Sequence, residues 1–199
     1  MRRDELEELH FITAIDNVPS ILEHGILSHY LSASRSHRSL AKQDVQEIRR
    51  TVTVPGGQNL HRYANLYITA RNPALRLMIG DHGHQEISVL RVSTDVLDVP
   101  HVVITDQNAA ARKYCRFAAA PEGLRIVDKD MVFAEYWTHP HPADEYRHRS
   151  VKCAEVLVLD RIDPNLILGG YVSGEESLGR IQGEAPHLNA TINRPLFFL

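Results

Sequence analysis

The segment from Val151 to Leu159 is almost entirely apolar, yet it contains the acid Glu155. Such a run predicts a strand that is buried on both faces. An ionised carboxylate in a dry core costs several kcal/mol unless something compensates its charge. We therefore expect Glu155 either to pair with a buried cation or to line a pocket whose ligand needs a negative charge. A third arrangement, at a strand edge, would let the side chain reach water.

The rest of the chain mixes helical and strand patterns without regular alternation, which predicts an α+β fold. The clearest helix starts at Asp16 or Asn17, which can cap it, and ends at Gly25. Residues 28–44 and 137–150 are polar, and we expect a loop or mobile cover and a second loop there. Further strands are predicted at 9–13, 66–69, 87–92, 101–105, 167–172 and 191–198, and further helices at 44–50, 74–79 and 108–117.

Length and composition indicate one ordinary globular domain over residues 1–199, because 43% of residues are hydrophobic and 24% are charged. The net charge of −3 argues against a broadly cationic coat for nucleic acid but leaves room for a local basic patch. Two cysteines provide no disulfide framework, and no stretch resembles a signal peptide or a membrane span. We therefore expect a cytoplasmic protein.

Several familiar site classes are disfavoured by spacing. The pairs Gly56-Gly57 and Gly169-Gly170 form neither a Walker loop nor a dinucleotide fingerprint. The pairs His82/His84 and His139/His141 lack matching cysteine or carboxylate spacing, so we predict no metal site, and a zinc hydrolase is only an alternative. Cys153 lies in the apolar run, where burial keeps a thiol protonated and unreactive.

Another set of polar residues is spread over several predicted elements. Each has a structural interpretation, such as a buried histidine, a packed tyrosine, a solvated arginine or an ion-pair partner for Glu155. Together they supply what splitting of NAD⁺ requires: a carboxylate beside the developing ribose cation, hydrogen-bonding groups for nicotinamide and ribose, and a cation for pyrophosphate or acceptor. The residues are His10, Thr13, Asn17, Arg49, Arg50, Tyr67, Arg71, Asn72 and Glu155.

Five blocks, in order, resemble the DarT toxins, which are ADP-ribosyltransferases that modify bases in single-stranded DNA. Residues 60–73 are similar to that family's LHDYxxxYFxxRxPM signature, residues 105–110 to its TDGNA block, and residues 152–158 to its xQAEFLV block. Residues 9–25 resemble the opening motif, and residues 45–50 the arginine segment. Arg62, Ala74 and the pair Lys152-Cys153 depart from the usual residues, but none of these changes removes a candidate catalytic group.

The resemblance implies an ADP-ribosyltransferase-like fold with a central split β-sheet flanked by helices. It implies that Glu155 is catalytic and that Arg50, in preference to Arg49, positions the base. The residues implied to bind NAD⁺ are His10, Thr13, Asn17, Tyr67 and Arg71. Those implied to contact DNA are Arg147, Arg149 and Lys152, with Trp137 or Tyr146 stacking on a base, although the same segment can be a solvated basic turn.

The expected function is therefore transfer of ADP-ribose from NAD⁺ to a base in single-stranded DNA. Asn65 to Tyr67 and Arg71 to Pro73 look more like the guanine-modifying branch of the family than the thymine-modifying one, so guanine is favoured. The resemblance also implies a neutralising macrodomain antitoxin that removes ADP-ribose. Alternatives are a transferase acting on RNA or protein, and a non-catalytic domain that binds single strands.

Overall fold

The computed structural model covers residues 1–199 and describes side chains throughout except at positions 112 and 113. Eight strands form one sheet in the order β10-β9-β4-β1-β3-β7-β5-β6, and two short strands pair separately as β2-β8. Neighbours in the large sheet are antiparallel, apart from the parallel pair β9 and β10. The strands are β1 (Leu9–Ala14), β2 (Ile26–Leu27), β3 (Tyr63–Tyr67), β4 (Ile87–Val92), β5 (Val103–Thr105), β6 (Phe117–Ala119), β7 (Glu155–Leu159), β8 (Arg161–Ile162), β9 (Ile167–Val172) and β10 (Ala190–Ile192).

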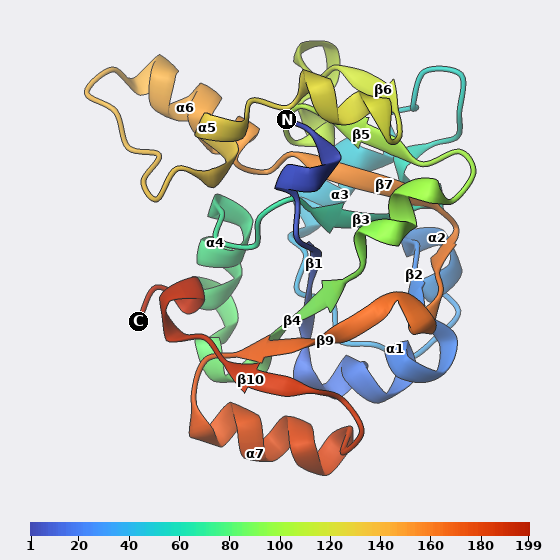
Figure 1. Cartoon of the computed structure of the whole chain (residues 1–199), viewed down its shortest axis with the longest axis vertical. Helices are drawn as coiled ribbons and strands as arrows, with labels where there is room; N and C mark the ends of the chain where they lie inside the picture. The colour runs from blue at the N-terminus through green and yellow to red at the C-terminus, as the bar shows by residue number, and fades with distance from the viewer.

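The large sheet divides between β1 and β3. These two strands share one registered pair, His10 with Tyr67, whereas β1 and β4 share six pairs and β3 and β7 share five. In Figure 1, β1 runs between a half that contains β4, β9 and β10 and a half that contains β3, β7, β5 and β6. The predicted central split sheet is confirmed, and the two halves diverge from that single pair.

Helices lie around both halves, with α7 beside β10, and α5 and α6 at the opposite end of the molecule (Figure 1). The α-helices are α1 (Val18–His24), α2 (His29–Ser32), α3 (Gln43–Arg50), α4 (Pro73–His82), α5 (Lys129–Phe133), α6 (Pro142–Val151) and α7 (Glu175–Glu184). The 3-10 helices are η1 (Arg3–Glu5), η2 (Ile15–Asn17), η3 (Leu60–Arg62), η4 (His84–Glu86), η5 (Thr94–Asp98), η6 (Ala109–Tyr114), η7 (Glu122–Ile126), η8 (Pro164–Leu166) and η9 (Arg194–Phe197).

The two faces of the sheet are covered by separate hydrophobic clusters. Leu66 and Val156 belong to the largest cluster, on one face. On the other face, Ile12 packs with Leu75 of α4 and Phe197 of the C-terminal segment. Because strand residues alternate between faces, the division into two clusters shows which side chains of β1, β3 and β7 point toward α4. Among the described residues, no helix combines the length and apolar character needed to cross a bilayer.

Two predictions near the acidic strand were wrong in detail. The expected loop at 137–150 contains α6, whose first turn holds Pro142 and whose N-terminus is capped by the side chain of His141. The expected strand from Val151 starts only at Glu155, because Val151 still belongs to α6 and a turn follows. The apolar residues at 151–154 are buried as a helix end and turn, which periodicity alone does not distinguish from a strand.

Candidate active site

A cavity of about 950 Å³ lies at the split of the sheet, at the upper end of the range for ligand pockets. Residues of β1 and β3 line it, and α3, α4 and α6 contribute further walls. The segment at 35–42, which follows α2, lines it as well. The predicted cover at residues 28–44 therefore contains the short helix α2, then an irregular segment beside the cavity, and then the first two residues of α3.

Glu155 lies at the first position of β7 and is 1% exposed. The Nη1 atom of Arg49 donates hydrogen bonds to both carboxylate oxygens, at 3.1 and 3.0 Å. The backbone N–H of Ala109 donates a third, at 2.9 Å, to Oε1. The hydroxyl of Thr105 accepts from the backbone N–H of Glu155 at 3.0 Å. The block at 105–110 therefore holds the acid in place, a structural role that the sequence did not reveal.

Arg49 contacts Glu155, whereas Arg50, the predicted catalytic arginine, does not. Arg49 is 7% exposed and lines the cavity, whereas Arg50 is exposed and lies outside the cavity lining. Successive residues on a helix point about 100° apart, so only one of two adjacent arginines at the end of α3 can face the cavity. The structure therefore brings Arg49, and not the predicted Arg50, to Glu155 and to the cavity.

Three of the five predicted cofactor-binding residues, Thr13, Asn17 and Tyr67, line the cavity. Tyr67 pairs directly with Glu155 across β3 and β7, and burial together with the nearby carboxylate raises the pKa of its phenol, which stays protonated. The amide nitrogen of Asn17 donates to the hydroxyl of Thr13 at 3.2 Å and to the carbonyl of Arg38 at 2.8 Å. The side chain of Asn17 is therefore already engaged within the protein.

His10 lies outside the cavity lining, in a polar cluster around Glu8. Its Nε2 lies 3.2 Å from Oε1 of Glu8, and Arg91 and Tyr171 donate to the same carboxylate at 2.6 and 3.0 Å. Although burial favours the neutral acid, these three hydrogen bonds lower the pKa of Glu8 to about 2. The structure therefore places the His10 side chain in a structural ion cluster and not in the cavity.

Arg71, which was also predicted to bind the cofactor, lies outside the cavity lining. Its guanidinium donates to the carbonyls of Pro195 at 3.0 Å and Glu135 at 2.8 Å. It also stacks over the ring of Phe198, with 4.6 Å between the guanidinium carbon and the ring centroid. Arg71 thus ties the C-terminal segment to the loop before α6, because it bonds a carbonyl of each.

The predicted DNA contacts fall into two groups. Arg147 and Arg149 are exposed on α6, and Arg149 lines the cavity together with Tyr146, which is 78% exposed. Lys152, in contrast, is 2% exposed, and its Nζ donates to the carbonyls of Val132 and Ala134, each at 2.8 Å. Burial lowers the pKa of this amine to about 8. The structure therefore places Lys152 inside the protein with backbone carbonyls as partners, away from the exposed arginines of α6.

Trp137, one of the two aromatic residues proposed to stack on a base, packs edge-on against Phe198 at a centroid distance of 5.9 Å. Tyr146 is the more accessible of the two, since it is exposed at the cavity.

Sequence reasoning missed several cavity residues. His29 and His61 line one wall with their ring centroids 4.2 Å apart, and burial lowers the pKa of both imidazoles, which favours their neutral forms. Arg35, Asn65 and Asn108 line other parts of the cavity. The Ser/Arg/His-rich composition of residues 28–44 signalled His29 and Arg35, whereas the other three residues lie in the blocks at 60–73 and 105–110.

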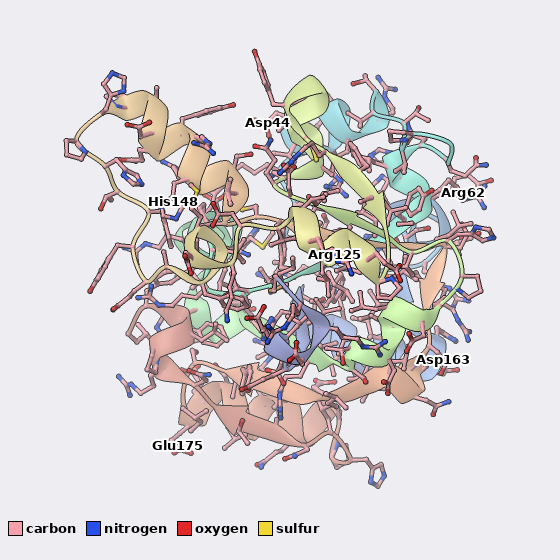
Figure 2. The ribbon with its side chains drawn as sticks, turned by 45° about the horizontal axis from the view of Figure 1, so that its top comes forward. Asp44, Arg62, Arg125, His148, Asp163 and Glu175 are labelled. Carbon is pink, nitrogen blue, oxygen red and sulfur yellow. The ribbon has the colours of Figure 1, made fainter. Side chains whose placement is uncertain are left out.

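Three of the four histidines in the two predicted pairs, His84, His139 and His141, bind protein groups. Nδ1 of His84 lies 2.9 Å from the hydroxyl of Ser173. Nε2 of His139 lies 2.7 Å from Nδ1 of His148, a residue of α6 that Figure 2 labels beside α5. His148 in turn contacts the carbonyl of Met131 in α5 at 2.8 Å. Across the residues whose side chains are described, no group of three or more potential ligands is arranged to hold a metal ion.

A split sheet with a buried glutamate behind the wall of a large cavity is the arrangement expected from the family resemblance, and known structures share the fold. The structure of Thermus sp. 2.9 DarT in complex with ADP-ribosylated ssDNA aligns with a TM-score of 0.83 and 27% identity, covering 99% of each chain. The structure of the same protein in complex with NAD⁺ aligns with a TM-score of 0.78, at 26% identity and 97% coverage of this chain.

Residues 10–195 match the family described as ssDNA thymidine ADP-ribosyltransferase, DarT, and the chain belongs to this family. A DNA ADP-ribosyl transferase-DNA ADP-ribosyl glycohydrolase fusion protein of Thermosipho africanus is 32% identical over 198 residues, which cover 96% of this chain. The chain spans about half of that relative, since the match covers 49% of it. A DNA ADP-ribosyl transferase of Thermus aquaticus is 28% identical over 161 residues, covering 76% of this chain and 68% of the relative.

Proposed function

We propose that this chain transfers ADP-ribose from NAD⁺ to a base in single-stranded DNA. The observation that carries the proposal is the buried Glu155 carboxylate, which Arg49 and Ala109 hold immediately behind the wall of a 950 Å³ cavity. Family membership supports the same reaction, as do the relatives bound to NAD⁺ and to ADP-ribosylated ssDNA. The cavity also fits the cofactor chemically, because it offers an arginine, hydroxyls and amides to a charged, polyhydroxylated ligand.

In the proposed reaction the bond between nicotinamide and the ribose C1′ breaks, and its electron pair leaves with nicotinamide. Positive charge develops on the ribose, and the carboxylate of Glu155 stabilises it in a site shielded from water. A nitrogen of the base then forms the new bond to C1′ from the opposite face and loses a proton to solvent. No metal is needed for this sequence, because the leaving nicotinamide is neutral once it has departed.

Arg49 must shift during this reaction, because it lines the cavity and Glu155 is not among the lining residues. Arg49 donates to both carboxylate oxygens, but Ala109 donates to Oε1 alone. Rotation of the guanidinium would therefore free Oε2 for a ribose hydroxyl while Ala109 continues to hold Oε1. The released cation would then lie beside the bound pyrophosphate or the incoming base. Stabilising charge suits it better than accepting a proton, because an arginine stays protonated near neutral pH.

Guanine is the proposed acceptor base, supported by the resemblance of residues 65–67 and 71–73 to the guanine-modifying branch. The DNA strand would enter past α6, where Arg147 and Arg149 can contact phosphates and Tyr146 can stack on a base. A single strand suits this site, since no base has to be extruded from a duplex before reaction.

A macrodomain-type glycohydrolase is the proposed partner. The Thermosipho relative, in which a DNA ADP-ribosyl glycohydrolase is fused to the transferase, supports this pairing. The glycohydrolase would remove the ADP-ribose that this chain attaches, and a toxin–antitoxin pair would result. We propose a cytoplasmic location, where both NAD⁺ and single-stranded DNA occur.

The test is mass spectrometry of matched oligonucleotides incubated with NAD⁺, one with guanine as its only purine and one in which thymine replaces every guanine. The proposal predicts one added ADP-ribosyl group on the guanine oligonucleotide and none with Glu155→Gln. Modification of the thymine oligonucleotide alone would reverse the base assignment. Label on RNA or on protein in parallel incubations would identify the alternative transferases, and binding of DNA without nicotinamide release would identify a non-catalytic domain.

A further inference from the structure

Residues 33–37 connect α2 to Arg38, and the last three of them, Arg35, Ser36 and His37, form part of the cavity wall. The hydrogen bonds found within this stretch are local: Ser34 donates to Leu31 at 3.3 Å, and the ring of His37 lies 3.0 Å from the carbonyl of Arg35. Further along, the buried Leu40 packs into the core, and Lys42 pairs with Asp81 of α4 at 3.3 Å. These two contacts fix the chain at residues 40–42.

Arg38, directly after residues 33–37, anchors the segment to the body of the protein. Both backbone polar groups of Arg38 bind the side-chain amide of Asn17, at 2.9 Å through the N–H and 2.8 Å through the carbonyl. Its guanidinium hydrogen-bonds to Glu86 of η4 and lies 3.7 Å from Asp16 of η2. Arg180 of α7 binds the same two carboxylates, at 2.9 Å for Glu86.

Two arginines and two carboxylates from four separate segments thus form a closed ring of charge at one residue of the cavity wall. Hydrogen bonds from Arg38 and Arg180 lower the pKa of Glu86, so its carboxylate stays ionised at neutral pH. The ring is partly exposed, with 31–46% of each side chain accessible. Its attraction is therefore sensitive to salt.

Arg35 precedes the anchor by three residues and lines the same cavity. Within the part of the chain whose side chains are described, no carboxylate pairs with Arg35, although most other arginines near this region are paired. A guanidinium without an anionic partner beside a large cavity suits phosphate oxygens, which it can bind through two parallel hydrogen bonds.

We propose that Arg38 is a positioning residue that holds this wall so that Arg35 can bind the pyrophosphate of NAD⁺. The inference rests on the proposed function, because it takes NAD⁺ as the ligand of this cavity. It also gives Asn17 a different role from direct cofactor contact. Asn17 would act through the backbone of Arg38, to which its amide is already bonded.

The test combines ligand binding with amide hydrogen exchange. Calorimetry would give the dissociation constant of carba-NAD⁺ for the wild-type protein, Arg35→Ala, Arg38→Ala, Arg38→Lys and the Arg35→Ala/Arg38→Ala double variant. Exchange would be followed over residues 33–38 in the same proteins without ligand. Arg161→Ala is the matched control, because Arg161 lies in an exposed ion pair with Asp163 outside the cavity lining.

We expect Arg35→Ala and Arg38→Ala each to weaken carba-NAD⁺ binding by about tenfold or more, the loss typical of a charge-assisted hydrogen bond. Only Arg38→Ala should speed exchange at 33–38, Arg38→Lys should restore part of both effects, and the double variant should bind little worse than either single one. Multiplied losses in the double variant would overturn the inference, as would weaker binding by Arg38→Ala with unchanged exchange.

The proposed function and this inference fail in different ways. If the wild-type protein does not bind carba-NAD⁺, the function is refuted and so is the assignment of Arg35 to pyrophosphate, whereas exchange still decides whether Arg38 holds the wall. If the wild-type protein binds and Arg38→Ala binds equally well, the inference alone is refuted.

Discussion

The ion pair between Arg49 and Glu155 should be replaceable for folding but not for catalysis. Glu155→Ala leaves the guanidinium of Arg49, which is 7% exposed, without its counter-ion and leaves the N–H of Ala109 without its acceptor. Breaking a buried pair in this way costs about 3–5 kcal/mol of unfolding free energy. Arg49→Met should lower the unfolding free energy by a similar amount, because it leaves the carboxylate of Glu155, which is 1% exposed, without its counter-ion.

The double variant Arg49→Met/Glu155→Leu should recover most of that loss. Replacing a buried pair by apolar side chains of similar volume is often neutral or stabilising by about 1–4 kcal/mol. The unsatisfied N–H of Ala109 offsets this by about 1–3 kcal/mol. We therefore expect the double variant within about 2 kcal/mol of wild type, with no transfer activity.

Urea unfolding followed by circular dichroism measures the three free energies, and nicotinamide release measures activity in the same preparations. If either single variant costs less than about 1 kcal/mol, the carboxylate is not buried against Arg49 as described. If the double variant retains transfer, the pair plays no part in the reaction.

Three further outcomes follow from where the structure places individual residues. Arg49→Ala should reduce oligonucleotide modification at least a hundredfold and Arg50→Ala by less than threefold, and the reverse order would restore Arg50 as the catalytic arginine. Arg147→Ala should lower the slope of log affinity against log salt for a single-stranded oligonucleotide by about 1, whereas Lys152→Met should leave that slope unchanged; equal changes would mean that Lys152 reaches DNA. Burial lowers the pKa of Lys152 to about 8 from 10.5, so between these pH values the unfolded chain binds more protons than the folded one. The unfolding free energy of wild type should therefore rise with pH over that range relative to that of Lys152→Met. Parallel pH curves for the two proteins would show that the amine is solvated.

The sequence predicted that Glu155 needs either a buried cation or a pocket, and the structure provides both. Arg49 is both the buried cation that pairs with Glu155 and a residue of the cavity wall, so the two interpretations do not exclude each other. A single sequence cannot choose between adjacent arginines at a helix end, because that choice depends on which face of α3 packs inward. The family resemblance favoured Arg50, whereas in the structure it is Arg49 that pairs with Glu155.

Chain direction and packing also explain why Lys152, His10 and Arg71 lie away from the cavity lining. Lys152 reads as a phosphate contact because it follows two arginines, but the turn between α6 and β7 directs it into the protein. His10 and Arg71 lie in blocks that resemble the family's motifs. In the structure, however, the side chain of His10 contacts Glu8, and that of Arg71 donates to backbone carbonyls. The bounds of β4 and β9 were predicted to the residue, and for β4 the alternation of residues 87–92 indicated a strand without tertiary information.

The most direct test of the central claim is a crystal structure of this protein with carba-NAD⁺ bound. We expect the nicotinamide ribose to lie in the cavity at the split of the sheet, with Oε2 of Glu155 within hydrogen-bonding distance of a ribose hydroxyl and Arg49 rotated away from that oxygen. A nicotinamide ribose bound elsewhere, with both hydrogen bonds between Arg49 and Glu155 intact, would contradict it.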